Sequence, residues 1–93
     1  MADLDRAIQL GIFDASAYSD RGYAYFVLGR CDRALADLDK AIALEPGLAA
    51  AYVNRAAVYR ALGQGAKADA DDAKAQSIDP TYVPPPAAPM SDR

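Results

Sequence analysis

The 93-residue sequence contains no histidine, no tryptophan and a single cysteine. Without imidazole there is no Ser–His or Cys–His nucleophile pair and no histidine ligand for a metal ion. One cysteine permits neither an internal disulfide nor the thiolate cluster of a zinc site. We therefore expect no catalytic residues, no metal site and no cofactor, so the protein is not expected to be an enzyme.

Excess positive charge and long apolar runs are also missing. Ten basic residues face thirteen acidic ones, and the net charge is −3, so no basic surface for nucleic acid is expected. No apolar stretch approaches the roughly 20 residues of a membrane span, and no signal peptide opens the chain. The sequence thus predicts a cytoplasmic protein that binds neither nucleic acid nor a membrane.

Large apolar side chains are few: Leu, Ile, Val and Phe together number 18, whereas there are 22 alanines. Such a composition borders on that of disordered chains, but disorder of this kind also needs high net charge, which is absent here. Alanine is the strongest helix former. The composition favours an all-α protein in which close helix packing replaces bulky side chains.

An internal repeat organises the chain. Residues 15–48 align without a gap on residues 49–82, at an offset of 34, and 13 of the 34 positions are identical. Carried backwards, the offset places residues 3–10 on residues 37–44. The identical pairs include Tyr18 and Tyr52, Arg21 and Arg55, Tyr25 and Tyr59, Asp37 and Asp71, and Pro46 and Pro80.

The repeat predicts four segments. Residues 1–14 form the second helix of an incomplete repeat and a turn, residues 15–48 and 49–82 are the two whole repeats, and residues 83–93 are an extended proline-rich tail. Proline-rich sequence favours the polyproline II conformation. We therefore expect the array to stop near Tyr82.

Each whole repeat reads as two helices. In the first repeat, residues at three- and four-residue steps share one inward face of the first helix, and Gly29 closes this helix in a left-handed conformation. The second helix ends at Glu45-Pro46-Gly47. The inward residues are Tyr18, Gly22, Tyr25 and Leu28 in the first helix, and Ala34, Leu38, Ala41 and Ile42 in the second. Gly22 and Ala41 lack bulk, so the helix axes approach closely there.

This pattern resembles the tetratricopeptide repeat (TPR), a helix-turn-helix unit of 34 residues. The resemblance implies a right-handed superhelix, here of about two and a half repeats. It also implies that the first helices line a concave side that binds an extended peptide or a partner helix. The residues that carry the resemblance are Tyr18, Gly22, Tyr25, Ala34, Leu38, Ala41 and Pro46 in the first repeat, and Tyr52, Ala56, Tyr59, Ala68, Ala75 and Pro80 in the second.

The second helix of the second repeat, Ala66–Ile78, departs from this pattern. Asp69, Asp72 and Gln76 replace Leu35, Leu38 and Ile42 of the first repeat. Polar residues at these stacking positions suit a terminal repeat whose outer face meets water.

The face of the first helices that lies outside the core is the predicted binding surface. It carries more apolar and aromatic residues than solubility requires, and aromatic residues beside an arginine are typical of binding hot spots. In an alternative interpretation, Tyr23 and Phe26 pack between neighbouring first helices and Arg60 is a solvated helix residue. The predicted peptide-binding residues are Ser19, Tyr23, Phe26, Val27, Val53, Asn54, Ala57 and Arg60.

The remaining charged residues are read as structural. Asp37 with Lys40, and Asp71 with Lys74, are three residues apart and are interpreted as solvated surface pairs. Arg21 and the equivalent Arg55 are expected to bridge to acidic residues or helix ends of a neighbouring element.

The predicted function is that of a non-catalytic module for protein–protein interaction, whose partner is a protein or a peptide. The alternative is a self-assembling structural unit in which the lone N-terminal helix or the proline-rich tail completes a neighbouring molecule. Because that helix lacks its own first helix, we expect homo-oligomers formed through Leu4, Ala7 and Ile8.

Overall fold

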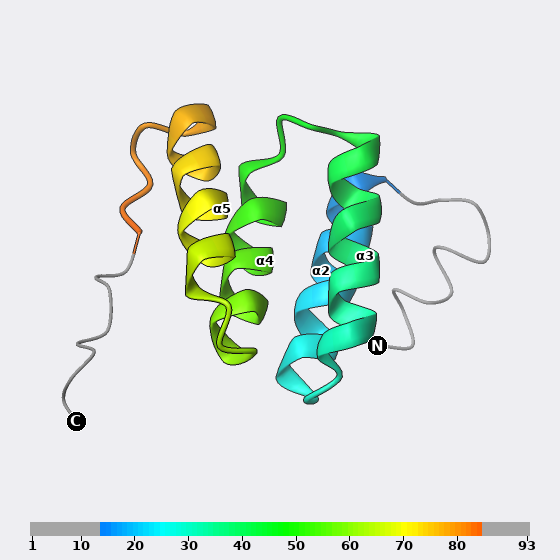
Figure 1. Cartoon of the computed structure of the whole chain (residues 1–93). Helices are drawn as coiled ribbons and strands as arrows, with labels where there is room; N and C mark the ends of the chain where they lie inside the picture. Colours follow the sequence, from blue (N-terminus) through cyan, green and yellow to red (C-terminus); the bar gives the residue numbers. More distant parts are fainter. Residues whose placement is uncertain (1–13, 85–93) are drawn as a thin grey trace, which may run out of the picture.

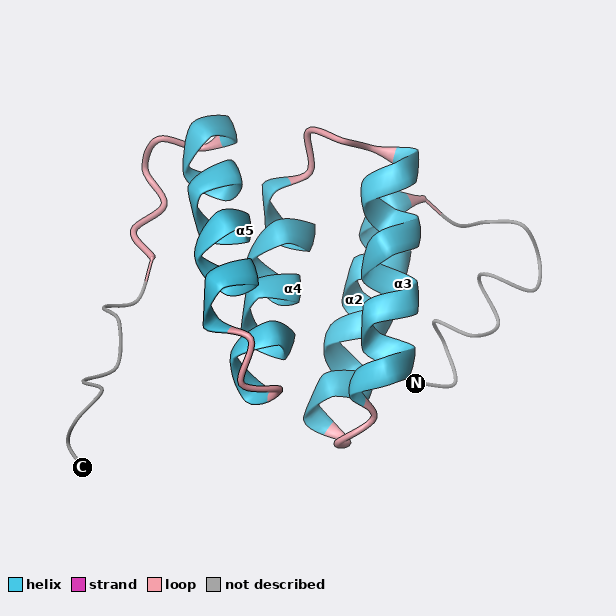
Figure 2. Cartoon of the chain, viewed as in Figure 1, coloured by secondary structure: helices cyan, strands magenta, loops and turns pink. Residues whose placement is uncertain are grey.

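The computed structural model describes residues 14–84, which form four helices and, within this range, no strand. The helices are α2 (Ala15–Val27), α3 (Cys31–Leu44), α4 (Ala49–Ala61) and α5 (Gly65–Ile78). They make two helical hairpins that lie side by side, with α4 packed against both α2 and α3 (Figures 1 and 2). The prediction of an all-α helical repeat fold is therefore confirmed.

Short sequence signals set the helix ends. The Asp14 carboxylate accepts a hydrogen bond from the backbone N–H of Ala17 at 2.9 Å and so caps the start of α2. Gly29 and Gly63 have φ values of +81° and +77° and close the first helix of each hairpin, as the left-handed conformation predicted for Gly29 requires. The helix α3 ends at Leu44, just before Pro46.

The core is thin and built largely of alanine. One cluster joins Ala15, Ala41 and Ala51, and a second joins Ala34, Leu38 and Val58. Phe26, Tyr25, Leu35 and the half-buried Cys31 pack against the second cluster. Contrary to the sequence-based expectation, Leu28 does not face the core. It is 59% exposed, because it follows the last residue of α2 and no longer lies on the helix face.

Gly22 allows α2 and α3 to approach closely. A Cβ atom at this position would lie 2.9 Å from Leu38 Cγ and 3.2 Å from the backbone oxygen of Ala34. Both distances are shorter than ordinary carbon contacts. The close approach predicted at Gly22 is thus present, and Leu38 fills the space that the missing side chain leaves.

An arginine in each hairpin is fixed by an aspartate sixteen residues later. Arg21 donates to both carboxylate oxygens of Asp37, at 2.7 and 2.8 Å. Arg55 does the same with Asp71, at 2.8 Å for each bond. The expectation that these arginines bridge to acidic residues of another element is correct. Asp37 and Asp71, however, are buried, so interpreting them as solvated partners of nearby lysines was wrong.

Tyrosine rings flank each arginine. The guanidinium carbon of Arg21 lies 5.9 Å from the ring centroid of Tyr18 and 5.6 Å from that of Tyr25. Arg55 has the same relation to the equivalent tyrosines, at 5.6 and 5.7 Å. Cation–π attraction operates over such distances, so the repeated tyrosines and arginines form one packed unit in each hairpin.

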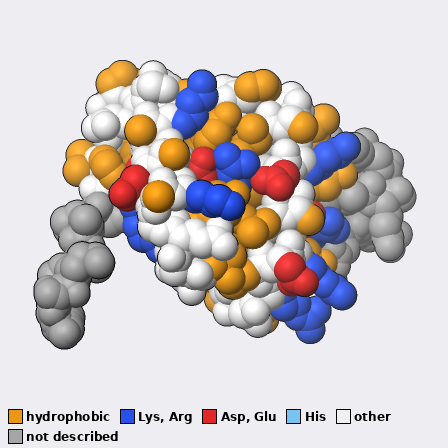
Figure 3. Space-filling view, viewed as in Figure 1, with side chains coloured by type: hydrophobic (Ala, Val, Ile, Leu, Met, Phe, Trp, Pro, Cys, Tyr) orange, Lys and Arg blue, Asp and Glu red, His pale blue; other side chains and the backbone are white. Residues whose placement is uncertain are grey.

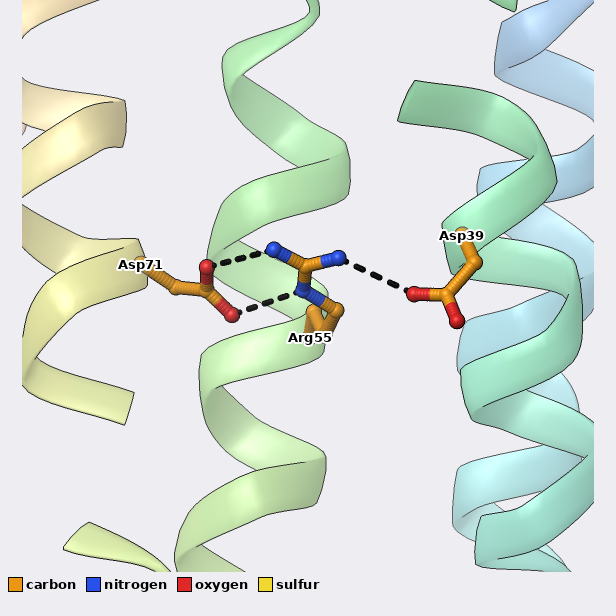
Figure 4. Close-up of polar contacts among 3 residues, drawn as sticks. All are labelled: Asp39, Arg55 and Asp71. Carbon is orange, nitrogen blue, oxygen red and sulfur yellow. Dashed lines mark hydrogen bonds and ion pairs between the residues drawn. The ribbon is translucent and has the colours of Figure 1, made fainter. Parts of the chain in front are cut away.

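Arg55 also links the two hairpins. Its third nitrogen donates to Asp39 on α3 at 2.9 Å, while Asp71 on α5 occupies the other side of the guanidinium (Figure 4). One side chain on α4 therefore contacts α3 and α5 at once and helps to fix how the hairpins stack.

We predict that Gly22→Ala destabilises the protein. The overpacking against Leu38 costs about 1–3 kcal/mol, which outweighs the gain of up to about 1 kcal/mol in helix propensity. A net loss of about 1 kcal/mol should appear as an earlier urea midpoint. Gly65→Ala is the matched control, because nothing lies within 4 Å of its added Cβ. Equal stability of Gly22→Ala and wild type would contradict the close approach.

Candidate functional site

A row of exposed side chains runs along the face of α2 that points away from α3. Tyr23 and Val27 are 48% and 66% exposed, and the helical spacing places them in line with the exposed Ser16 and Asp20. The equivalent residues of α4, at the 34-residue offset, are Ala50, Asn54, Ala57 and Ala61. We call these eight positions the outer row.

The outer row contains a hollow between α2 and α4. It measures about 380 Å³ and is lined by Asp20, Tyr23 and Asn54. The residue of α4 equivalent to Tyr23 is Ala57, so the side chain at this position is smaller on α4 than on α2. We call the space lined by Asp20, Tyr23 and Asn54 the Asp20 hollow.

A hydrogen bond across the two helices orients one wall of the hollow. The side-chain nitrogen of Asn54 donates to the Ser19 hydroxyl at 3.0 Å, and Ser19 is only 2% exposed. The bond fixes the amide nitrogen toward the interior. The amide oxygen of Asn54 is left as an acceptor that meets no donor among residues 14–84.

The predicted binding residues differ in how far they are exposed. Tyr23 and Val27 are exposed, while Val53, Asn54 and Ala57 on α4 are half-buried. Ser19 is buried, and Phe26 packs against the core cluster of Leu38 and Val58. Phe26 also supports Tyr23, since their ring centroids lie 6.1 Å apart at 54°. Phe26 therefore contributes to the core, as the alternative interpretation gave it a packing role, although the cluster it packs against includes residues of α3 as well as α4. The binding role of the whole set stays a prediction.

Arg60, the last residue of the predicted set, turns toward α5. Its guanidinium pairs with Asp72 and, at 3.3 Å, with Asp69. The hydrogen bond with Asp72 is the main reason that the pKa of Arg60 is raised above its usual value. Arg60 is thus neither a purely solvated residue nor a free cation on the outer row.

The expectation that the polar residues of α5 face water is wrong for Asp72. It is buried, although its neighbours Asp69 and Gln76 are exposed. Besides Arg60, its carboxylate accepts a hydrogen bond from the Tyr82 hydroxyl at 2.9 Å. Burial, and then the bond to Asp72, raises the pKa of Tyr82. The charged position that replaces Leu38 is satisfied by a local network, so water does not need to reach it.

The charge balance of α2 and α4 leaves one unpaired group. Arg21, Arg55 and Arg60 each pair with aspartates, whereas Asp20 forms no ion pair with any residue in the described range. On the face shown in Figure 3, Lys and Arg side chains lie next to Asp and Glu side chains, with hydrophobic ones between them. The arginines of α2 and α4 are therefore neutralised by aspartates, and Asp20 remains an exposed negative charge.

Asp20 was absent from the predicted binding set although it lines the hollow. Its exposed helical position was visible in the sequence, beside Tyr23 on the same face. The repeat alignment also pairs it with Asn54. What the sequence does not show is that both residues border one hollow.

Two further properties concern only the described part of the chain. Residues 14–84 contain no group of three His, Cys, Asp or Glu side chains placed to hold a metal ion. None of the described helices has the length and apolar character needed to cross a membrane. The predicted cytoplasmic location stays a prediction.

The predicted self-association residues, Leu4, Ala7 and Ile8, lie outside the described range. Homo-oligomer formation likewise stays a prediction.

The two stacked helical hairpins define the protein as a helical repeat protein. Residues 22–63, which are 42 of the 93 residues, match a family model described as TPR repeat, so this segment is similar to the tetratricopeptide repeat family. Repeats of this family generally mediate interactions between proteins and are typically non-catalytic. A comparison with curated proteins gave no match.

We predict that Arg60→Ala destabilises the second repeat through Asp72. Leaving a buried acceptor without its donor costs about 1–3 kcal/mol, measurable by urea unfolding. Asp72→Asn in the Arg60→Ala background removes the buried charge and should recover part of this loss. If the double variant is as unstable as Arg60→Ala, the stranded carboxylate is not the cause.

We predict that Tyr82 stabilises the fold in a pH-dependent way. Tyr82→Phe removes the bond to Asp72 and should cost about 1 kcal/mol at neutral pH. Because the folded pKa of Tyr82 is raised above 10.0, this contribution is present below pH 10 and is lost as pH rises through the raised pKa. Thermal melts of both proteins from neutral to alkaline pH should therefore converge. A constant difference throughout would disprove the assignment.

Proposed function

We propose that this protein is a non-catalytic interaction module that binds an extended peptide or a partner helix along the outer row of α2 and α4. The observation that carries the proposal is the exposure of Tyr23 and Val27 beside the Asp20 hollow. An exposed aromatic residue next to a recess is the kind of anchor around which binding hot spots form.

The outer row has large exposed side chains on α2 and small side chains on α4. On α2, Tyr23 and Val27 stand exposed in line, whereas α4 contributes Ala57 and Ala61 at the equivalent positions. A ligand lying over the alanines would contact the sides of Tyr23 and Val27 and bury their apolar surface. Burial of this kind contributes roughly 25 cal/mol per Å² before the costs of association.

The same geometry supports different roles for the predicted binding residues. We propose that Tyr23, Val27, Val53, Asn54 and Ala57 contact the ligand. The other three residues would support the binding surface without contacting the ligand. Ser19 orients Asn54, Phe26 supports Tyr23 and Arg60 neutralises Asp72.

We predict that Tyr23→Ala/Val27→Ala strongly weakens peptide binding without unfolding the protein. Random linear peptides displayed on phage would be selected for binding to the full wild-type chain. The enriched peptides would then be synthesised for affinity measurement. Loss of the aromatic anchor should weaken their binding at least about 10-fold. Helical circular dichroism should be unchanged, because both side chains are largely exposed.

Leu44→Ala/Val83→Ala is the matched control, since it also removes two exposed apolar side chains, but outside the outer row. It should bind the selected peptides like wild type. The proposal fails if the Tyr23→Ala/Val27→Ala variant binds like wild type, or if the control loses binding to the same extent. Sedimentation of the full chain alone separates peptide binding from the self-assembly that the sequence also suggested.

A further inference from the structure

We infer that the Asp20 hollow receives the guanidinium of an arginine side chain from the bound peptide. This inference rests on the proposed function and names the chemistry of its ligand. The groups that line the hollow are a carboxylate, an aromatic ring and an amide oriented by Ser19. An arginine offers hydrogen-bond donors to the first and last of these and a cationic plane to the ring.

The carboxylate is available for such a ligand. Asp20 is exposed and forms no ion pair with residues 14–84. Its neighbour Arg21 does not compete, because two bonds of 2.7 and 2.8 Å commit that guanidinium to Asp37 on α3. The other two arginines of α2 and α4 are likewise committed to Asp71 and Asp72. The hollow thus presents a negative charge that no described cation offsets.

The second acceptor is the amide oxygen of Asn54. Because the amide nitrogen donates to Ser19 from the buried side, the oxygen is directed away from that bond. An acceptor held in place by a buried partner loses little entropy when it binds a donor. Asp20 and Asn54 therefore each bring an oxygen acceptor to the hollow, and they come from different helices.

The protein already combines a carboxylate and tyrosine rings around a half-buried arginine twice. Arg21 and Arg55 each lie between a carboxylate that accepts two hydrogen bonds and tyrosine rings at 5.6–5.9 Å. Asp20 and Tyr23 repeat the pairing of carboxylate and tyrosine at the surface, three residues apart on α2. The arginine is the one component that this surface site lacks.

The hollow has room for one long side chain. Its volume of about 380 Å³ lies at the low end of the roughly 300–1,000 Å³ of small-molecule sites. A lysine could reach the same carboxylate, but its compact, strongly hydrated ammonium does not form the paired, planar contacts of a guanidinium. We therefore expect arginine to bind more tightly than lysine.

The test uses blocked pentapeptides with a central arginine, lysine, citrulline or glutamate between alanines. Each would be titrated into the full chain while backbone and Asn54 side-chain amide signals are followed by NMR. Arginine should bind about 3- to 10-fold more tightly than its neutral isostere citrulline, as expected for an exposed ion pair with a cation–π contact. Glutamate should bind least, and added salt should weaken only the cationic peptides.

Asp20→Asn removes the charge while keeping the shape, and should lower arginine binding to the citrulline level. Asp32→Asn is the matched control, because Asp32 is an exposed aspartate at the start of α3 and its loss changes net charge equally. The inference is overturned if arginine and citrulline bind equally, if Asp20→Asn binds arginine like wild type, or if no peptide shifts the signals around the hollow. The phage selection tests the proposed function independently of this inference, because the selected peptides need not contain arginine.

Discussion

The pairing of an arginine on each first helix with an aspartate on the following helix is the contact on which the rest of the structure depends. With alanine supplying most of the core, few large side chains are left to hold the hairpins. The bidentate bonds of Arg21 with Asp37 and of Arg55 with Asp71 fix the relative position of the paired helices. A buried carboxylate without such a partner would be costly, so the charge also disfavours other registers. Since Arg55 additionally holds Asp39, the same group connects packing within a repeat to packing between repeats.

This arrangement also decides what the outer surface of α2 and α4 presents. Arginines that could have made the outer row basic are directed to aspartates of α3 and α5. The row retains an aromatic ring, small residues and the single carboxylate of Asp20. Structural electrostatics and ligand chemistry are thus linked, because the aspartates that stabilise the hairpins also remove positive charge from the exposed side.

Much of the fold could be predicted because its signals are local. The helical spacing and the turn at Gly29 depend on residues near one another in sequence, while the 34-residue offset and the missing side chain at Gly22 are visible without knowing which side chains meet. The partner of Asp37 could not be found this way, because Lys40 is nearby in sequence whereas Arg21 comes from the preceding helix. For the candidate site, spacing identified Tyr23 and Val27 as outward-facing. It could not show that Ser19 is buried or that Asp20 and Asn54 border one hollow, since both facts depend on how α2 and α4 stack.

The match between Gly22 and Leu38 has a consequence for how the repeats can diverge. The equivalent positions in the second repeat hold Ala56 and Asp72, a larger residue on one helix and a smaller side chain on the other. Leucine needs the space that glycine leaves, whereas the aspartate tolerates an added methyl group and recruits Arg60 and Tyr82. Each pair therefore works as a set, so we expect an exchange of whole hairpins between the two repeats to be tolerated better than a crossover that places Ala56 opposite Leu38.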